Sequence, residues 1–255
     1  MFTPDTPLAH AVHPAHNREA RRGGAKPSLL ILHYTGMSSA AKAIDWLARS
    51  ESGVSCHYVI DEDGRITQLV PEDQRAWHAG VSYWRGETDI NSHSIGIEIQ
   101  NFGHQHGYPD FSPRQMRAVI ALSKDIAHRH RMAPDGILAH SDVAPGRKTD
   151  PGEKFNWLLL AKEGLGLWVR PSPVRADDPG LGLGAHGQRI ARAQECLASY
   201  GYDVEANGTL DAETEKVLKA FQLHFRPRRV DGRLDRSTEV TLERLIEASR
   251  KRAAA

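Results

Sequence analysis

The sequence has little of what would assign the protein to a membrane, to nucleic acid or to an oxidising compartment. No apolar run approaches the ~20 residues that a membrane-spanning helix needs. The net charge is only +1, which provides no general attraction for nucleic acid, so we expect no nucleic-acid partner. The two cysteines, Cys56 and Cys196, lie far apart and suggest no disulfide framework; free thiols fit a reducing compartment.

The N-terminus also lacks the apolar segment of a secretory signal peptide. Residues 1–27 contain many Pro, His and Arg residues without periodicity, which predicts an irregular arm. The bare N-terminus and the cysteine usage favour the cytoplasm, with the periplasm or the cell wall as the alternative. At 255 residues, of which 40% are apolar and 25% charged, the chain suits one large or two smaller globular domains.

Composition divides the remainder into two folded parts. Residues 28–168 contain both strand-like and helix-like segments, which predicts an α/β domain. Several prolines and glycines mark residues 169–184 as a linker. Residues 185–255 are predicted to form a small domain of three helices, at about 188–200, 212–224 and 236–250.

An internal repeat lies in this last part. Residues 207–214 (NGTLDAET) match residues 231–238 (DGRLDRST) in the pattern [Asn/Asp]-Gly-x-Leu-Asp-x-x-Thr. The Gly accepts the positive φ of a turn, the Leu fills the core, and the Asp caps the next helix. The segment shows no clustered metal ligands and no nucleophile arrangement, so we interpret it as a binding module.

Two predicted strands carry polar groups near their ends. Residues 29–32 are a continuous apolar run, typical of a strand buried on both faces, and His33 follows directly. A histidine in this place is also compatible with an ordinary core residue. In residues 94–101 (SIGIEIQN) three isoleucines alternate with small and polar residues, so Glu98 lies on the opposite face. This glutamate is either solvent-facing or a general base in a cleft.

A third segment, residues 137–152 (ILAHSDVAPGRKTDPG), combines a strand with a polar loop. Apolar residues run into His140, and a Pro/Gly-rich loop with Lys148 and Asp150 follows, which indicates a buried strand that ends in a site. His140 and Asp150 are a nitrogen and an oxygen ligand that Zn²⁺ accepts. With His33 as the third ligand, one coordination position stays open for water.

These five polar residues are the parts of a zinc hydrolase, because groups at neighbouring strand ends of an α/β sheet converge on one crevice. Zinc lowers the pKa of its water toward ~7. Glu98 is then expected to take the proton of the water and pass it to the leaving amine. Lys148 is expected to stabilise the oxyanion on the scissile carbonyl. The ligands are scattered, and no compact HExxH motif fixes them. The metal site alone also does not determine which amide is cut.

Three segments together resemble the zinc-dependent N-acetylmuramoyl-L-alanine amidases of the amidase-2 family, which are related to peptidoglycan recognition proteins. The segments are LHYTG at 32–36, SIGIEIQN at 94–101 and HSDVAPGRKTDPG at 140–152. Residues 180–250 resemble the peptidoglycan-binding domain 1 family. The resemblance implies a mixed central sheet flanked by helices, a C-terminal three-helix domain, one zinc ion per chain, and peptidoglycan fragments or muropeptides as partners.

The resemblance also implies residue roles and a reaction. His33, His140 and Asp150 become the metal ligands, Glu98 the catalytic glutamate and Lys148 the catalytic lysine. The implied reaction is hydrolysis of the amide between the lactyl group of N-acetylmuramic acid, or of its 1,6-anhydro form, and L-alanine of the stem peptide, in cell-wall turnover or recycling. The alternatives are a peptidoglycan-recognition protein that binds without cutting and a zinc peptidase of another specificity.

The segment Trp77-His78-Ala79-Gly80 matches a groove-lining segment of the family, so Trp77 and His78 are expected to contact the substrate. Asn101 is expected to line the same groove. Ordinary packing is the alternative for His78 and Asn101. The sequence leaves the oligomeric state open, and it does not decide whether the C-terminal domain binds glycan or only packs on the amidase.

Overall fold

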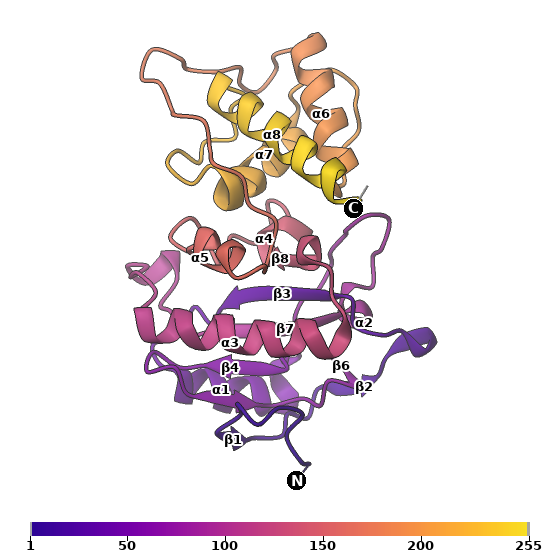
Figure 1. The fold of residues 1–255 in the computed structure, drawn as a ribbon, viewed down its shortest axis with the longest axis vertical. Helices are drawn as coiled ribbons and strands as arrows, with labels where there is room; N and C mark the ends of the chain where they lie inside the picture. The colour runs from indigo at the N-terminus through magenta and orange to yellow at the C-terminus, as the bar shows by residue number, and fades with distance from the viewer. Residues whose placement is uncertain (1, 254–255) are drawn as a thin grey trace.

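The computed structural model describes residues 2–253, which form a mixed α/β part with a helical module at one end of the long axis (Figure 1). The large sheet has the strand order β1-β5-β4-β7-β3-β8. Its strands are β1 (Ala11–Val12), β3 (Leu29–Tyr34), β4 (Tyr58–Ile60), β5 (Ile66–Gln68), β7 (Ser94–Ile99) and β8 (Ile137–Ala139). β4 and β5 pair antiparallel and the other neighbours pair parallel, which confirms the predicted mixed sheet.

Helices flank the sheet and build the module. In the α/β part they are α1 (Ala40–Ala48), α2 (Ile90–His93), α3 (Pro113–His130), α4 (His140–Val143) and α5 (Trp157–Lys162); in the module they are α6 (Gln188–Tyr200), α7 (Ala212–Phe225) and α8 (Arg236–Ala253). Ser39 and Ser112 cap α1 and α3 through their side-chain oxygens. No helix in the described part of the chain is long and apolar enough to cross a membrane.

The two central strands β3 and β7 present one apolar and one functional face. Leu30 and Leu32 of β3 pack with the isoleucines of β7 and with α3 in one hydrophobic cluster. The alternate residues of both strands point to the other face, because side chains alternate along a strand. His33 pairs in register with Glu98, so strand pairing alone makes these two polar side chains neighbours.

The N-terminal segment is not the irregular arm that its composition predicts. It contributes β1, which pairs with β5, and β2 (Arg18–Ala20), which pairs antiparallel with β6 (Gln74–Ala76). Arg21 is buried, and its guanidinium donates hydrogen bonds to the carbonyl oxygens of Ser92 and Ser94. A buried Arg needs such partners. They come from residues more than 70 positions away, beyond the reach of a local pattern.

The internal repeat of the module builds two matching turns. Gly208 and Gly232 both have a φ of +73°, which favours glycine. The side-chain oxygen of Gln194 accepts a hydrogen bond from the backbone N–H of Gly208, and that of Gln222 accepts one from Gly232 in the same way. The aspartate of each copy caps the following helix, as predicted.

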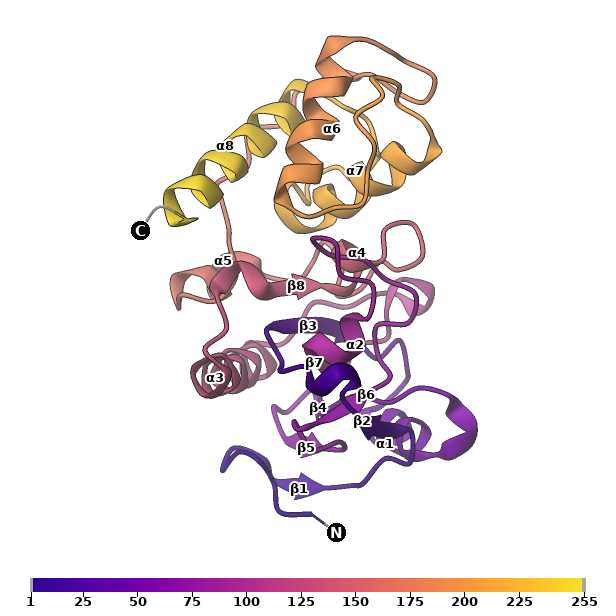
Figure 2. The same cartoon turned by 90° about the vertical axis from the view of Figure 1, so that its right-hand side faces the viewer.

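The module packs directly on the α/β part. Figures 1 and 2 show α7 above α4 and the β8 edge of the sheet, and α4 contacts α7. Ile31 and Leu138 of the sheet belong to the same hydrophobic cluster as Tyr202 and Phe221 of the module. Residues 169–184, the predicted linker, contain no helix or extended strand, and Val169 and Leu181 of this segment pack against the core that the two parts share.

A buried carboxylate links the two parts, and it provides a first test. Oδ1 of the fully buried Asp142 accepts from the Tyr202 hydroxyl at 2.6 Å, and Oδ2 accepts from His224 Nδ1 at 2.7 Å. We expect Tyr202→Phe to lower the free energy of unfolding by about 1–3 kcal/mol, because a buried acceptor loses a donor. Chemical denaturation of the whole chain measures the change.

The matched control for this prediction is Tyr200→Phe. Tyr200 is equally buried beside Tyr202, but its hydroxyl makes no hydrogen bond within residues 2–253. We therefore expect its substitution to change stability by less than about 0.5 kcal/mol. Equal losses in the two variants would mean that the bond to Asp142 adds nothing to the contact between the parts.

Candidate functional site

Three polar side chains from distant parts of the chain meet at one point. Nδ1 of His33 lies 2.9 Å from Nδ1 of His140. Oδ2 of Asp150 lies 3.1 Å from the first of these nitrogens and 2.9 Å from the second. His33 lies near the end of β3, and His140 follows β8 directly. Because β3 and β8 are parallel neighbours, their carboxyl ends bring the two histidines to the same edge of the sheet.

Local hydrogen bonds position the second and third members of this cluster. Oδ2 of Asp142 accepts from the backbone N–H of Ala139 at 2.8 Å and so holds the first turn of α4, which presents His140. The backbone N–H of Ser141 donates to the carbonyl oxygen of Asp150 at 3.0 Å. The turn with His140 and the loop with Asp150 are therefore tied together.

The ligand atoms fit a divalent cation. Nε2 of His140 lies 3.1 Å from the carbonyl oxygen of Ala79, which can only accept, so Nε2 carries the proton and Nδ1 presents a lone pair. Burial and the neighbouring His140 lower the pKa of His33 to about 4, so this imidazole is also neutral. The Nδ1 lone pairs of the two histidines face each other and the Asp150 carboxylate. These groups repel one another unless a cation lies between them. Zn–N distances of about 2.0–2.1 Å at tetrahedral angles separate ligand atoms by roughly 3.3 Å, close to the spacing here.

The two carboxyl groups of the site differ in their charge. Burial opposes ionisation of Asp150, but His140 and His33 hold the pKa of this carboxyl well below its usual range. Burial raises the pKa of Glu98 well above its usual range; Asp150 adds to this effect and Lys148 opposes it. Oε2 of Glu98 is buried and has no hydrogen-bond partner in the described chain. A free oxygen and a raised pKa suit a group that transfers protons.

The cluster opens into a cleft of about 320 Å³. Glu98, His140, Lys148 and Asp150 line this cleft, and His33 lies directly behind them in contact with His140. The structure therefore brings together all five residues that the sequence predicts as ligands and catalytic groups.

The three predicted substrate contacts are placed differently. Among the residues that the structure describes, His78 lines the cleft, whereas Trp77 and Asn101 do not. The Asn101 side chain holds the following loop, because Nδ2 donates to the carbonyl oxygen of Pro109 at 2.9 Å and Oδ1 accepts from the N–H of Gly103 at 2.9 Å. A role of these residues in substrate binding stays a prediction.

Sequence patterns assign no role to Arg147, although it precedes Lys148 in the same loop. Its guanidinium lines the cleft and donates hydrogen bonds to the carbonyl oxygens of Val81, at 3.0 Å, and Ala79. Arg147 therefore holds the chain segment that also accepts the hydrogen bond from His140. The only local signal for this role is the place of the cation in the Pro/Gly-rich loop.

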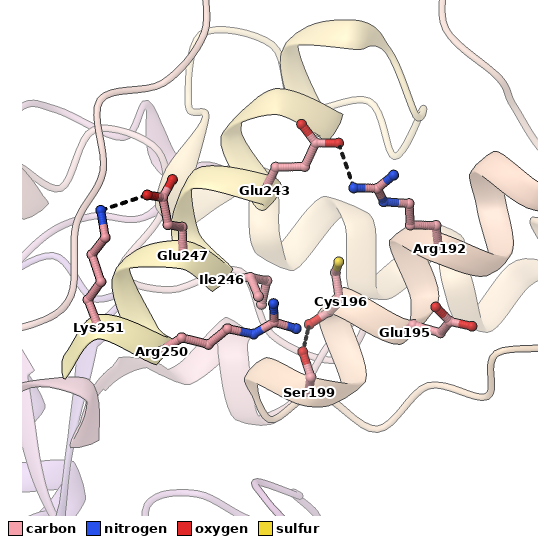
Figure 3. A pocket seen from close by; sticks show the side chains of 9 residues that line it. All are labelled: Arg192, Glu195, Cys196, Ser199, Glu243, Ile246, Glu247, Arg250 and Lys251. Carbon is pink, nitrogen blue, oxygen red and sulfur yellow. Dashed lines mark hydrogen bonds and ion pairs between the residues drawn. The ribbon is translucent and has the colours of Figure 1, made fainter. Parts of the chain in front are cut away.

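A second hollow, of about 530 Å³, lies between α6 and α8 in the module (Figure 3). An ion pair of 3.5 Å between Arg192 and Glu243 bridges the two helices, and Cys196 lies in the wall between them. Within residues 2–253, the one cluster of His, Cys, Asp and Glu that could hold a metal is His33, His140 and Asp150. The module therefore contributes a surface hollow, whereas the candidate metal ligands and proton-transfer groups lie in the α/β part.

Fold and site together define a class of protein. A mixed sheet carries a two-histidine, one-aspartate cluster at its strand ends, and a proton-transferring carboxyl and an ammonium group share the cleft. This arrangement is that of a hydrolase whose site can hold a metal ion.

Comparison with known proteins gives the particular family. The family model described as N-acetylmuramoyl-L-alanine amidase matches residues 23–153, and the model described as putative peptidoglycan binding domain matches residues 186–242. The chain is 39% identical over 246 residues to the N-acetylmuramoyl-L-alanine amidase AmiD of Escherichia coli, which covers 90% of this chain and 86% of that protein.

Two solved structures are similar over most of their length. The complex of Escherichia coli AmiD with the substrate anhydro-N-acetylmuramic acid-L-Ala-D-γ-Glu-L-Lys has a TM-score of 0.73 and 37% identity, and covers 90% of this chain and 92% of that one. AmpDh3 of Pseudomonas aeruginosa in complex with anhydromuramic pentapeptide has a TM-score of 0.72 and 31% identity, with 91% and 95% covered.

The chain therefore belongs to the N-acetylmuramoyl-L-alanine amidase family. This confirms the family, the fold class and the enzyme class that the sequence predicts: a hydrolase of the muramoyl–L-alanine amide of peptidoglycan. The alternative of a protein that only recognises peptidoglycan is not supported.

Proposed function

We propose that this cleft hydrolyses the amide between the lactyl group of 1,6-anhydro-N-acetylmuramic acid and L-alanine, with one zinc ion held by His33, His140 and Asp150. The observation that carries the proposal is the meeting of these three ligand atoms within 3.1 Å of one another, beside the buried carboxyl of Glu98. Zinc is supported by the donor set, since two imidazoles and one carboxylate leave a fourth position open.

The residues of the chain then share the chemistry. A zinc ion in this place supplies a Lewis acid and lowers the pKa of water toward about 7. Glu98 accepts the proton of the attacking water and returns it to the amine of L-alanine, a role that its raised pKa and free oxygen support. The ammonium of Lys148 lies in the same cleft and stabilises the oxyanion that forms on the lactyl carbonyl.

The muropeptides bound in the two similar structures support the anhydro form of the sugar as the substrate. The match of the module to a putative peptidoglycan binding domain supports peptidoglycan fragments as partners. We propose the cytoplasm as the compartment, because Cys56 and Cys196 are both free thiols, which suit a reducing environment. The periplasm or the cell wall is the alternative.

Product analysis with and without a chelator tests the proposed reaction. With a purified anhydro-muropeptide we expect free stem peptide and free anhydro-N-acetylmuramic acid, identified by mass spectrometry. Chelation should lower the rate at least about 100-fold, because the Lewis acid contributes several kcal/mol to the reaction. Recovery of the rate on addition of zinc is the control.

Two outcomes would contradict the proposal. Binding of the muropeptide without release of any product would mean that the site does not cut this substrate. Cleavage of a different amide would indicate a peptidase of another specificity. Parallel incubation with intact sacculi shows whether the anhydro sugar is required.

A further inference from the structure

The two ligand histidines are held from behind by adjacent residues of one segment. Since Nδ1 of each ring faces the ligand point, each ring has its Nε2 left for the protein. Nε2 of His33 lies 3.1 Å from Nδ1 of His78, and Nε2 of His140 lies 3.1 Å from the carbonyl oxygen of Ala79. One dipeptide therefore contacts the outer side of both rings.

A chain of hydrogen bonds determines the protonation of His78 and His33. The Ser94 hydroxyl donates its only proton to the carbonyl oxygen of Ile90 at 2.6 Å. Oγ of Ser94 must then accept from Nε2 of His78, at 3.2 Å, so Nδ1 of His78 has no proton. This Nδ1 accepts from Nε2–H of His33, which leaves the lone pair of His33 on the ligand atom Nδ1. Each step has one donor and one acceptor.

Asn91 fixes the dipeptide itself. Its side-chain oxygen accepts from the backbone N–H of His78 at 3.0 Å and from that of Ala79 at 2.8 Å. Asn91 is 6% exposed and lies on α2 next to Ile90, whose carbonyl ends the chain of hydrogen bonds from His33. A single short helix thus supports both contacts to the ligand histidines.

The sheet makes room for this arrangement at Gly96. A Cβ at Gly96 would lie 2.5 Å from the ring of His78, so only glycine allows the ring to lie against β7. Gly96 stands between Ser94 and Glu98 on the same face of the strand. Ser94 and Gly96 are the small residues of this face. Their size leaves room for the His78 ring behind the ligand cluster.

We propose that His78 and Asn91 are positioning residues of the metal site: His78 sets the proton and orientation of His33, and Asn91 holds His78 and the Ala79 carbonyl in place. The proposal rests on the proposed metal site. It differs from the expectation that His78 contacts the substrate, because both ring nitrogens of His78 are bonded within the protein. Supporting hydrogen bonds of this kind fix the orientation and basicity of a histidine ligand.

Zinc binding by the full-length protein tests this role. Asn91→Ala and His78→Phe should raise the zinc dissociation constant about 10–100-fold, measured by competition with a chelator. Asn91→Asp keeps an oxygen that accepts both N–H groups. Its zinc dissociation constant should stay within about threefold of the wild-type value. At saturating zinc, the KM for the anhydro-muropeptide should be unchanged in all three variants.

The visible spectrum of the cobalt(II)-substituted protein provides a readout that does not depend on activity. We expect its bands to shift in His78→Phe and to be retained in Asn91→Asp. The matched control is Asn17→Ala, which removes another buried asparagine that holds a loop through bonds to the carbonyl oxygens of Arg49 and Val54. It should lower the thermal midpoint and leave zinc affinity and the spectrum unchanged.

The outcomes separate this proposal from the proposed function. Unchanged zinc affinity in Asn91→Ala and His78→Phe would overturn the positioning role, as would an equal loss in Asn17→Ala. A raised KM with unchanged zinc affinity would make His78 a substrate contact instead. If the unchanged protein itself bound no zinc, the proposed metal site would be the part that fails.

Discussion

Replacing Glu98 with Gln is expected to retain zinc and to lower turnover by about 10²–10⁴-fold, the range that a positioned acid–base group contributes. The amide keeps the size of the side chain, so the ligand cluster stays intact, but it cannot accept a proton from water. Two measurements check the two halves of this result: kcat at saturating anhydro-muropeptide, and zinc bound per chain by metal analysis.

The matched control removes a different buried carboxylate. Glu72 is 3% exposed and accepts hydrogen bonds from Tyr58, Arg129 and His130. It is not among the described residues that line the cleft. Glu72→Gln should therefore lower stability and leave kcat nearly unchanged. A normal rate in Glu98→Gln would show that the assignment of the base is wrong.

Asp150→Ala is expected to abolish zinc retention, and activity with it, because only His33 and His140 then remain as protein ligands. The loss of affinity should exceed the roughly 10–100-fold that follows from loss of a supporting hydrogen bond. Metal analysis after dialysis, together with titration of zinc against a competing chelator, measures the effect.

Asp135→Ala is the control for this variant. Asp135 lies in the turn that precedes β8, at the opposite end of the strand from His140, and pairs with Arg85 at 2.9 Å. Its loss should leave one zinc ion per chain. If Asp150→Ala still held zinc as tightly as the unchanged protein, the ligand set proposed here would be incorrect.

Most elements of the fold follow from local patterns. The apolar run at 29–32 became β3, and the alternating isoleucines at 94–101 became β7. Ser112 and the proline that follows it form the start of α3. These signals succeed because burial on both faces, alternation and helix capping are properties of a few neighbouring residues. The segment before residue 28 differs from the prediction, because its order depends on distant carbonyl groups that accept hydrogen bonds from Arg21.

The residues of the site also differ in how far local sequence patterns indicate them. The meeting of His33, His140 and Asp150 agrees with the sequence patterns, because the two histidines follow apolar strand segments and Asp150 lies in the Pro/Gly-rich loop after the second. Asn91 was not predictable, since an asparagine in a four-residue helix carries no local signal of what it holds. The side chains of Trp77 and Asn101 show the reverse case, in which a segment that matches a family motif does not place each of its residues in the cleft.

The amino-acid sequence by itself determined most of the strands and helices after residue 28, which residue types can bind a metal, and the family of the chain. Periodicity, capping and ligand chemistry all reside in short stretches. Only the tertiary structure decided that His33 and Glu98 stand side by side, that His78 and Asn91 lie behind the ligands, and that the helical module shares a core with the amidase. These facts depend on strand register and on contacts between residues of separate segments, for which no local pattern exists.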